Sequence, residues 1–335
     1  MNKSALVITS IASHDHPVLK KFAHECSVRN MRFIVVGDTK SPKGFELKGC
    51  DFYPIERQQA LDFKLAETLP LKHYARKNIG YLIAMSKGAE TIIETDDDNY
   101  PLPSFWDVRK KTVSASLLRN KGWVNVYKYY TNEHVWPRGF ALEHIRDGLP
   151  ELEQPVSVTC PIQQGLADEN PDVDAIYRLI LPLPISFSKS GYVALGTSSF
   201  CPFNSQNTTW FKEAFPLLYL PSYCSFRMTD IWRSFVAQRV AWSCGWSILF
   251  HQSTVRQERN DHNLLKDFQD EISGYTNSSL IHRALENVNL KNGYEYIYDN
   301  IMLCYRILID LGVVGPQEIR LLNAWIEDIR SNTVA

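Results

Sequence analysis

The stretch AETIIETDDDNYP, residues 89–101, places three aspartates directly after a short apolar run. Its segment TIIET, residues 91–95, has the β-branched composition of a buried strand. Asp96, Asp97 and Asp98 follow with no basic residue beside them to balance their charge. In open α/β sheets, ligands bind in the crevice outside the carboxyl ends of the strands. The stretch therefore predicts a strand of such a sheet with a binding site at its end.

The residues before this stretch alternate between β-branched runs and helical segments, as parallel strands joined by crossover helices do. ALVITSI at 5–11 and RFIVVGD at 32–38 predict two strands, and HPVLKKFAHECSVRN at 16–30 predicts the helix between them. LPLKHYARKNIGYLIAMSKGAE at 69–90 fits a helix face roughly, with Gly88 as its stop. We therefore predict an α/β fold with a mostly parallel, Rossmann-like sheet flanked by helices.

The composition and predicted secondary structure of the chain change twice after the triplet. Residues 100–250 are irregular and rich in proline, aromatic residues and asparagine, which is typical of long ordered loops around a binding site. Beyond residue 260, helices are predicted at SLIHRALENVNL, YEYIYDNIMLCYRILIDLG and PQEIRLLNAWIEDIR. We accordingly divide the chain into a ligand-binding domain, residues 1–255, and a C-terminal helical subdomain, residues 256–335.

Composition excludes several classes of protein. Of 335 residues, 44% are hydrophobic and 22% charged, as in a packed globular protein. The formal net charge of −1 does not indicate nucleic-acid binding. No apolar run approaches the roughly 18 residues of a membrane span, and seven single cysteines without a C-x-x-C pair favour reduced thiols. We expect a cytoplasmic protein without a transmembrane segment, which leaves room for peripheral attachment to the inner face of a membrane.

Adjacent carboxylates repel one another, and a divalent cation relieves that repulsion. Carboxylate oxygens suit Mg²⁺ or Mn²⁺, which complete their shells with waters and substrate phosphates; the alternative is a solvated acidic turn. An EF-hand loop starting at Asp96 is excluded, because Pro101 and Asp107 stand where glycine and glutamate are needed. The D-x-D-x-T pattern of an aspartyl-phosphate phosphohydrolase needs threonine at its fifth position, where this chain has Tyr100. A phosphohydrolase is therefore only a weak second hypothesis. The third reading is the D-x-D of a nucleotide-sugar glycosyltransferase, in which the metal grips the diphosphate.

Several segments carry a family resemblance. ARKNIGYLIAMSKGAETIIETDDDN, residues 75–99, resembles the A-R-N-x-G…D-x-D block of GT-A-fold glycosyltransferases, and also the matching segment of the UDP-arabinopyranose mutases. Together with further segments in the same order, it resembles the STELLO-like glycosyltransferase family over roughly residues 70–245. Those further segments are VWPRGFALE, IQQGLADENPDVD, PFNSQNTTWF and TDIWRSFVAQR.

The resemblance implies a GT-A-like fold, with nucleotide-sugar binding and catalysis in residues 1–255. It also implies a nucleotide-sugar donor, with a UDP-sugar as the default, Mn²⁺ or Mg²⁺ as the cofactor, and a glycan or glycolipid acceptor. Nucleotide-sugar contacts are expected from Thr9, Ser10, Asp38, Arg76, Asn78, Asp96 and Asp97. The structural alternatives are strand-end capping for Ser10 and Asp38 and a helix-surface cation for Arg76.

Asp230, in RMTDIWRSF, is the expected catalytic base, because inverting transfer needs a carboxylate to take the proton of the acceptor hydroxyl. It matches the aspartate of a D-x-W element in the mutase-like relatives. The alternative is an N-cap for the helix that follows.

The remaining expected site residues fall into two sets. The metal ligands are expected to be Asp96, Asp98 and His251. Contacts to the acceptor or to phosphate are expected from Arg138, Asn204, Gln206 and Arg256. Loop-stabilising hydrogen bonds are the alternative for each of the second set, and a structural role is the alternative for His251.

The predicted function is metal-dependent transfer of a sugar from a nucleotide-diphosphate sugar to a glycan or glycolipid. Inversion is favoured because a candidate base is present. Two alternatives stay open at this point. One is a nucleotide-sugar mutase, and the other is a non-catalytic scaffold that keeps the glycosyltransferase fold.

Overall fold

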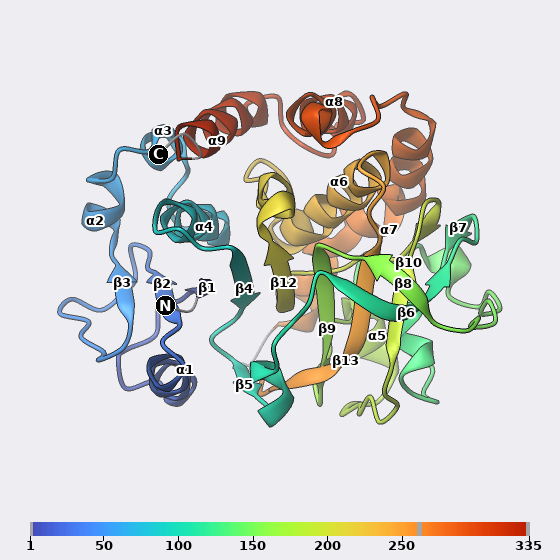
Figure 1. Ribbon diagram of the computed structural model, residues 1–335, viewed down its shortest axis with the longest axis horizontal. Helices are drawn as coiled ribbons and strands as arrows, with labels where there is room; N and C mark the ends of the chain where they lie inside the picture. The colour runs from blue at the N-terminus through green and yellow to red at the C-terminus, as the bar shows by residue number, and fades with distance from the viewer. Residues whose placement is uncertain (1–2, 260–262, 333–335) are drawn as a thin grey trace.

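The computed structural model describes residues 3–259 and 263–332, and it confirms the predicted α/β architecture (Figure 1). Its main sheet has the strand order β3-β2-β1-β4-β12-β9-β13-β10-β6-β8, with β5 paired to β13. Helices cover both faces of the sheet, and α8 and α9 run along the top of the view in Figure 1. The predicted strands and helices around the aspartate triplet are present, with their ends shifted by a few residues.

The N-terminal half of the sheet is parallel. β1 (Ser4–Thr9) pairs with β2 (Arg32–Val36) and with β4 (Thr91–Thr95), and β2 pairs with β3 (Asp51–Tyr53). Because successive side chains of a strand point to opposite faces, β1 is buried on both sides. Leu6 packs with α1 (Pro17–Val28) on one face, and Val7 packs with α4 (Lys77–Ser86) on the other.

Gly80 lets α4 lie close to this sheet. A Cβ atom at this position would come within 2.6 Å of Val7 and 2.7 Å of Val36. The predicted helix of residues 69–90 is shorter in the structure, where Tyr74–Arg76 form a 3₁₀ turn before α4. The predicted stop at Gly88 is confirmed, since Gly88 has a φ of +76°.

The C-terminal half of the sheet mixes directions. β12, β10 and β6 run opposite to the other strands on the path, so most strands share one direction, as predicted. The strands of this half are β5 (Asn99–Pro101), β6 (Thr112–Leu118), β8 (Val156–Thr159), β9 (Ile162–Asp168), β10 (Tyr192–Leu195), β12 (Asn207–Phe211) and β13 (Ile248–Gln257). A separate pair joins β7 (Gly122–Trp123) to β11 (Ser199–Phe200).

The other helices are α2 (Ile55–Gln59), α3 (Lys64–Thr68), α5 (Ala175–Ile180), α6 (Thr229–Ser243), α7 (Leu264–Asn287), α8 (Ile297–Asp310) and α9 (Glu318–Asn332). The C-terminal helices are as predicted, except that α7 begins 15 residues before the predicted segment. Asn263 caps it by accepting from the backbone N–H groups of Leu265 and Lys266, each at 3.1 Å. No helix in the described ranges is long and apolar enough to span a membrane.

α9 is tied to the N-terminal half of the chain. Asp328 accepts hydrogen bonds from the backbone N–H groups of Lys64 and Leu65 at the start of α3, both at 2.9 Å. At the other end of α9, Glu318 accepts from the backbone N–H groups of Ser222 and Tyr223. The division of the chain at residues 255 and 256 stays a prediction.

Candidate functional site

Two cavities adjoin at the carboxyl ends of β1, β2 and β4. The first, of about 390 Å³, lies over β1 and β2 and is called here the β1–β2 cavity. The second, of about 300 Å³, holds the aspartate triplet and is called the aspartate cavity. Thr9, Tyr74, Asp97 and Phe226 line both, so the two cavities form one continuous site.

Aromatic rings form one wall of the β1–β2 cavity. The ring of Phe226 meets those of His73 and Tyr74 edge to face, with centroids 5.4 and 5.2 Å away. Burial lowers the pKa of His73, so the ring is neutral at physiological pH. An uncharged aromatic wall of this kind suits a flat heterocycle such as a nucleobase.

Asp38 lies at this cavity as expected, but its carboxylate is engaged by the backbone. It accepts from the N–H groups of Lys72 at 2.9 Å and His73 at 3.0 Å, and from its neighbour Thr39 at 2.6 Å. Lys72 has a φ of +57°, a conformation that the two bonds to Asp38 help to hold. Asp38 therefore fixes the loop that carries His73.

Arg76 lines the β1–β2 cavity and is buried. Its Nε donates to Gln58 Oε1 at 2.7 Å, and its Nη1 donates to the carbonyl of Leu69 at 3.0 Å. Its Nη2 is buried and has no hydrogen-bond partner in the described part of the chain. Arg76 is therefore not a helix-surface cation, and its place at the β1–β2 cavity is compatible with the nucleotide-sugar contact expected of it.

Each aspartate of the triplet has a different partner. Asp96 pairs with Lys77, whose side chain is fully buried and whose Nζ lies 2.9 Å from Asp96 Oδ1. Asp97 accepts from the hydroxyl of Ser10, at the end of β1. Asp98 accepts from Gln257 Nε2 at 2.9 Å, and its second oxygen, Oδ1, is buried without a partner among the described residues. Burial raises the pKa of Asp98 to about 7, and the charges of Asp96 and Asp97 add to the rise.

The triplet fits a hard divalent cation. In residues 3–259 and 263–332, no group of three or more His, Cys, Asp and Glu side chains is already arranged to hold a metal. The unpartnered oxygen of Asp98, together with two more carboxylates against one lysine, nevertheless offers the oxygen donors that Mg²⁺ and Mn²⁺ prefer. Such an ion would take its remaining ligands from water and from substrate phosphates.

The structure does not bring His251 to the triplet. It lies on β13, paired with Tyr192 of β10, and lines neither cavity. Its Nδ1 is 3.0 Å from the carbonyl oxygen of Gln252, and burial lowers its pKa to about 3, with the charge of Arg109 adding to the fall. The predicted metal role therefore finds no support in its position, which is that of a core histidine.

Asp230 does line the aspartate cavity, where Arg138 holds it. Arg138 Nη1 and Nη2 each lie 3.1 Å from an oxygen of Asp230, and the backbone N–H of Ser205 donates to it at 3.1 Å. Burial alone would raise the pKa of Asp230, but the charge and hydrogen bonds of Arg138 outweigh it and hold the pKa well below its ordinary value. The helix N-cap is Met228, with no side-chain capping bond, so Asp230 does not serve as the cap.

A second carboxylate shares the same arginine. Arg138 Nε and Nη2 lie 2.7 and 2.8 Å from the two oxygens of Asp172, in a loop that precedes α5. Arg138 thus bridges two carboxylates at the wall of the cavity. This pairing joins segments that are 34 and 92 residues apart in the sequence.

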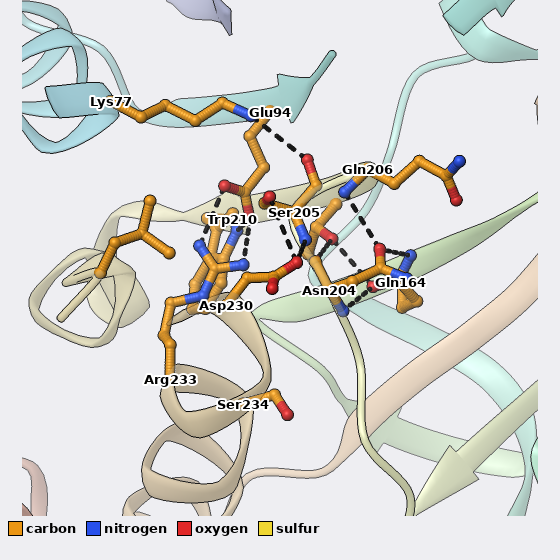
Figure 2. A network of polar contacts seen from close by, with 12 residues as sticks. Lys77, Glu94, Gln164, Asn204, Ser205, Gln206, Trp210, Asp230, Arg233 and Ser234 are labelled. Atoms are coloured by element: carbon orange, nitrogen blue, oxygen red, sulfur yellow. Dashed lines mark hydrogen bonds and ion pairs between the residues drawn. The ribbon is translucent and has the colours of Figure 1, made fainter. Parts of the chain in front are cut away.

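A buried polar network lies beside Asp230 (Figure 2). Arg233 of α6 lies 2.8 Å from Glu94 of β4, and both side chains are buried, with 1% and 0% exposure. Trp210 Nε1 donates to the same glutamate at 2.8 Å. The pair joins the helix that carries Asp230 to the strand that ends in the triplet, which fixes their relative position.

The loop between β11 and β12 completes this wall (Figure 2). Asn204 is buried and accepts from Gln164 Nε2 at 3.2 Å and from the backbone N–H of Gln206 at 3.0 Å. These bonds present Ser205 and Gln206 to the aspartate cavity, which both residues line. Of these two expected contacts to the acceptor or to phosphate, Gln206 lies at the cavity, whereas Asn204 makes the loop-stabilising bonds given as its alternative.

Two further expected residues lie outside both cavities. Asn78 is buried in α4 and clamps Leu220, accepting from its N–H at 2.9 Å and donating to its carbonyl at 2.8 Å. Arg256 lies over the ring of Tyr100, 4.7 Å from its centroid, and 2.6 Å from Glu258. These contacts explain both residues without a ligand.

The sequence reasoning missed other lining residues. They include His73, Tyr74, Asp172, Arg178, Ser205, Phe226, Arg227, Gln257 and Arg259. Lys77, which pairs with Asp96, was also missed, although it stands between two residues that the motif singled out. For Asp172 and the arginines the sequence holds only scattered charges in loops, and their pairing depends on contacts between distant segments.

Comparisons with known proteins find similarity to glycosyltransferases. A family model described as STELLO glycosyltransferases matches residues 227–334, which include Asp230 and α7 to α9. Two Arabidopsis thaliana proteins are similar over 96% of the chain: "Probable glycosyltransferase STELLO2" at 26% identity and "Probable glycosyltransferase STELLO1" at 25%. The chain spans 44% of the length of these curated relatives.

Two solved structures are similar to this chain at low sequence identity. A mycobacterial protein gives a TM-score of 0.45 at 10% identity, covering 84% of this chain and 74% of that one. The glucosyl-3-phosphoglycerate synthase of M. tuberculosis gives 0.40 at 9% identity, covering 83% and 80%. The predicted resemblance is confirmed by the sequence comparisons: over almost its whole length, this chain is similar to the STELLO glycosyltransferases.

Proposed function

We propose that this chain is a glycosyltransferase that binds a nucleotide-diphosphate sugar across the two cavities and transfers the sugar to a glycan or glycolipid. The observation that carries the proposal is the continuity of the two cavities. An aromatic-walled cavity at the ends of β1 and β2 opens, at Thr9 and Asp97, into a polar cavity with three aspartates. A nucleotide sugar has the same order of parts, with a flat base at one end and a charged diphosphate and sugar at the other.

The β1–β2 cavity would hold the nucleoside. The base would pack on the ring wall of His73, Tyr74 and Phe226, and the ribose would lie near Ser10 and Asp97, where the two cavities join. A UDP-sugar is the default donor, because the family resemblance of the sequence implies it. The buried and unpartnered Nη2 of Arg76 offers a donor for a base carbonyl at this end.

The aspartates would hold the metal, with Asp98 and Asp96 as its direct ligands. When bound, Mn²⁺ or Mg²⁺ would neutralise charge on the diphosphate leaving group. Lys77 holds Asp96 in place and offsets part of the charge of the triplet. Ser10 does the same for Asp97 by donating a hydrogen bond.

Asp230 would accept the proton of the acceptor hydroxyl. Because Arg138 keeps its pKa low, Asp230 is ionised at any physiological pH, which a proton acceptor requires. A low pKa also makes a weak base. We therefore expect proton transfer late in the reaction, once the bond to the diphosphate has largely broken and the attacking hydroxyl has become acidic.

Nucleotide binding gives the first test. Thermal unfolding of the chain would be measured with UDP, GDP, CMP and ADP, each with Mn²⁺ or with a chelator. A ligand present at a hundred times its Kd stabilises by about 2.7 kcal/mol, which shifts the Tm of a chain this size by several degrees. We expect a shift with UDP that needs Mn²⁺ and disappears in Asp98→Asn.

The control is Asp310→Asn, at an exposed carboxylate at the end of α8, which should keep the full shift. Absence of a shift with every nucleotide would refute the proposed donor site. A normal shift without transfer to any of a panel of glycan acceptors would point to a scaffold that binds nucleotide without turnover.

A further inference from the structure

Four arginines line the aspartate cavity, and three of them have carboxylate partners. Arg138 pairs with Asp172 and Asp230. Arg227 donates to Glu271 at 2.9 and 2.7 Å, and Arg259 donates to Asp267 at 2.5 Å. Arg178 is the fourth, and in the described ranges no carboxylate lies within ion-pair distance of it.

The guanidinium of Arg178 is held in place by neutral groups. It projects from α5, where its Nη2 donates to the carbonyl of Pro171 at 2.8 Å and its Nη1 lies 3.4 Å from Asn170 Oδ1. Its Nε is buried and makes no hydrogen bond within the described part of the chain. The side chain is thus fixed in position, and its buried Nε–H is unused.

The surroundings of Arg178 are unfavourable for a cation. Burial and the charges of Arg259 and Arg227 together lower its pKa to about 9. Asp172 is the carboxylate that acts on it most strongly, but both oxygens of Asp172 already receive hydrogen bonds from Arg138. A half-buried cation without a counter-ion is costly, and an anionic ligand would remove that cost.

The chemistry of that ligand follows from the side chain. A guanidinium presents its N–H donors in a planar fork that matches the oxygens of a phosphate or a carboxylate. Arg227 and Arg259 also orient α7 through Glu271 and Asp267, so a structural role accounts for both. Among the described residues Arg178 has no carboxylate partner of this kind, and the two neighbouring cations would add to the attraction for an anion.

The arginines share the aspartate cavity with the triplet and stand apart from the proposed nucleoside site. Arg178, Arg227 and Arg259 line the aspartate cavity but not the β1–β2 cavity. The groups that act most strongly on Arg178 are Arg259, Asp172, Arg227 and Glu271, and none of them belongs to the triplet. A diphosphate bound at Asp96–Asp98 would therefore leave Arg178 available to a second molecule.

We propose that Arg178, flanked by Arg227 and Arg259, binds a phosphate or carboxylate group of the acceptor, so that the sugar is transferred to an anionic acceptor. The assignment of that group to the acceptor rests on the proposed function. Anion binding at Arg178 does not depend on the proposed function. The experiment below separates the two.

Binding of inorganic phosphate to the full chain would be measured by calorimetry, with and without saturating UDP and Mg²⁺. We expect phosphate to bind the UDP-loaded protein, and Arg178→Gln to weaken that binding at least tenfold. Arg178→Lys should retain part of it, because the charge remains. Arg306→Gln, at an exposed arginine of α8, is the matched control and should bind phosphate normally.

The affinity of Arg178→Gln for UDP shows that the variant is folded, and we expect it to match the wild type within twofold. Loss of phosphate binding when UDP is bound would overturn the proposal, since the arginines would then hold the diphosphate of the donor. Equal phosphate binding by Arg178→Gln and wild type would overturn it as well. Phosphate binding that depends on Arg178 in a chain that binds no nucleotide would refute the proposed function and leave the anion site standing.

Discussion

The two cavities of the site are built in different ways. All but one of the residues that line the β1–β2 cavity come from the first 97 residues, at strand ends or in the loop before α4. The aspartate cavity draws its lining from residues 9 to 259, in segments that only the complete fold brings together. The β1–β2 cavity is thus specified by local sequence, and the aspartate cavity by ion pairs between distant segments. Changes on the two sides should therefore affect different properties of the protein.

Asp230→Asn tests the aspartate cavity alone and should have the largest effect. If Asp230 takes the proton of the acceptor, the rate of transfer should fall by about a hundredfold to ten-thousandfold, while UDP still binds. Rates with saturating donor and the Kd for UDP would be measured together. Asp172→Asn is the matched variant, because it also removes one partner of Arg138. An equal loss in both variants would show that Asp230 only positions Arg138.

Arg233→Met tests whether the buried pair behind the cavity holds its two sides together. It leaves Glu94 buried without its charged partner, which should cost about 3–5 kcal/mol of the free energy of unfolding. Urea unfolding followed by circular dichroism gives the value. The double variant Arg233→Met with Glu94→Gln removes both charges and should recover part of the loss. A single variant as stable as the wild type would contradict this account of the pair.

The pH dependence of stability tests His251, which lies in the sheet and lines neither cavity. Its folded pKa of about 3 lies below the ordinary value of 6.5, so its contribution to stability is complete above pH 6.5 and is lost as the pH falls toward 3. Between pH 6.5 and 5 this loss amounts to about 2 kcal/mol. We expect His251→Gln to lose less stability than the wild type over that interval.

The same variant checks the metal role predicted for His251. Its Kd for UDP with Mn²⁺ should equal that of the wild type, because the residue lines neither cavity. A metal requirement that changes in His251→Gln would restore the sequence-based prediction and contradict the site described above.

Phe226→Ala should have the smallest effect, on the wall that the two cavities share. The ring is 51% exposed and packs edge to face on His73 and Tyr74. Losing one aromatic contact with a base should cost about 1 kcal/mol, or about a fivefold rise in the Kd for UDP. Stability should hardly change. A large loss of stability would instead make Phe226 part of the core.

Much of the fold could be predicted because its signals are local. β-branched runs predicted β1, β2 and β4, and the position of the aspartates after β4 placed them at the binding edge of the sheet. The same rule correctly brought Thr9, Ser10 and Asp38 to the cavities. Where a residue follows a predictable strand, its place follows from the strand.

Roles taken from residue type alone find less support in the positions of the residues. Asn78, Asn204 and Arg256 have polar side chains that suit a ligand, yet each is explained by bonds within the protein. Conversely, nothing in the sequence near Arg178 shows that it lacks a counter-ion. Arg178 lacks a counter-ion because the nearby Asp172 is paired with Arg138, and Asp172 and Arg138 are 34 residues apart in the sequence. A single sequence does not reveal that two arginines compete for one carboxylate.

The bonds made by α9 have a consequence for how the molecule unfolds. Glu318 holds the backbone of residues 222 and 223, a few residues before Phe226 and Asp230, while Asp328 holds the first turn of α3. α9 therefore connects the loop that leads into α6 with the segment that leads into α4. Shortening the chain from its C-terminus would loosen both approaches to the site at once, so the site and the final helix should melt as one cooperative unit.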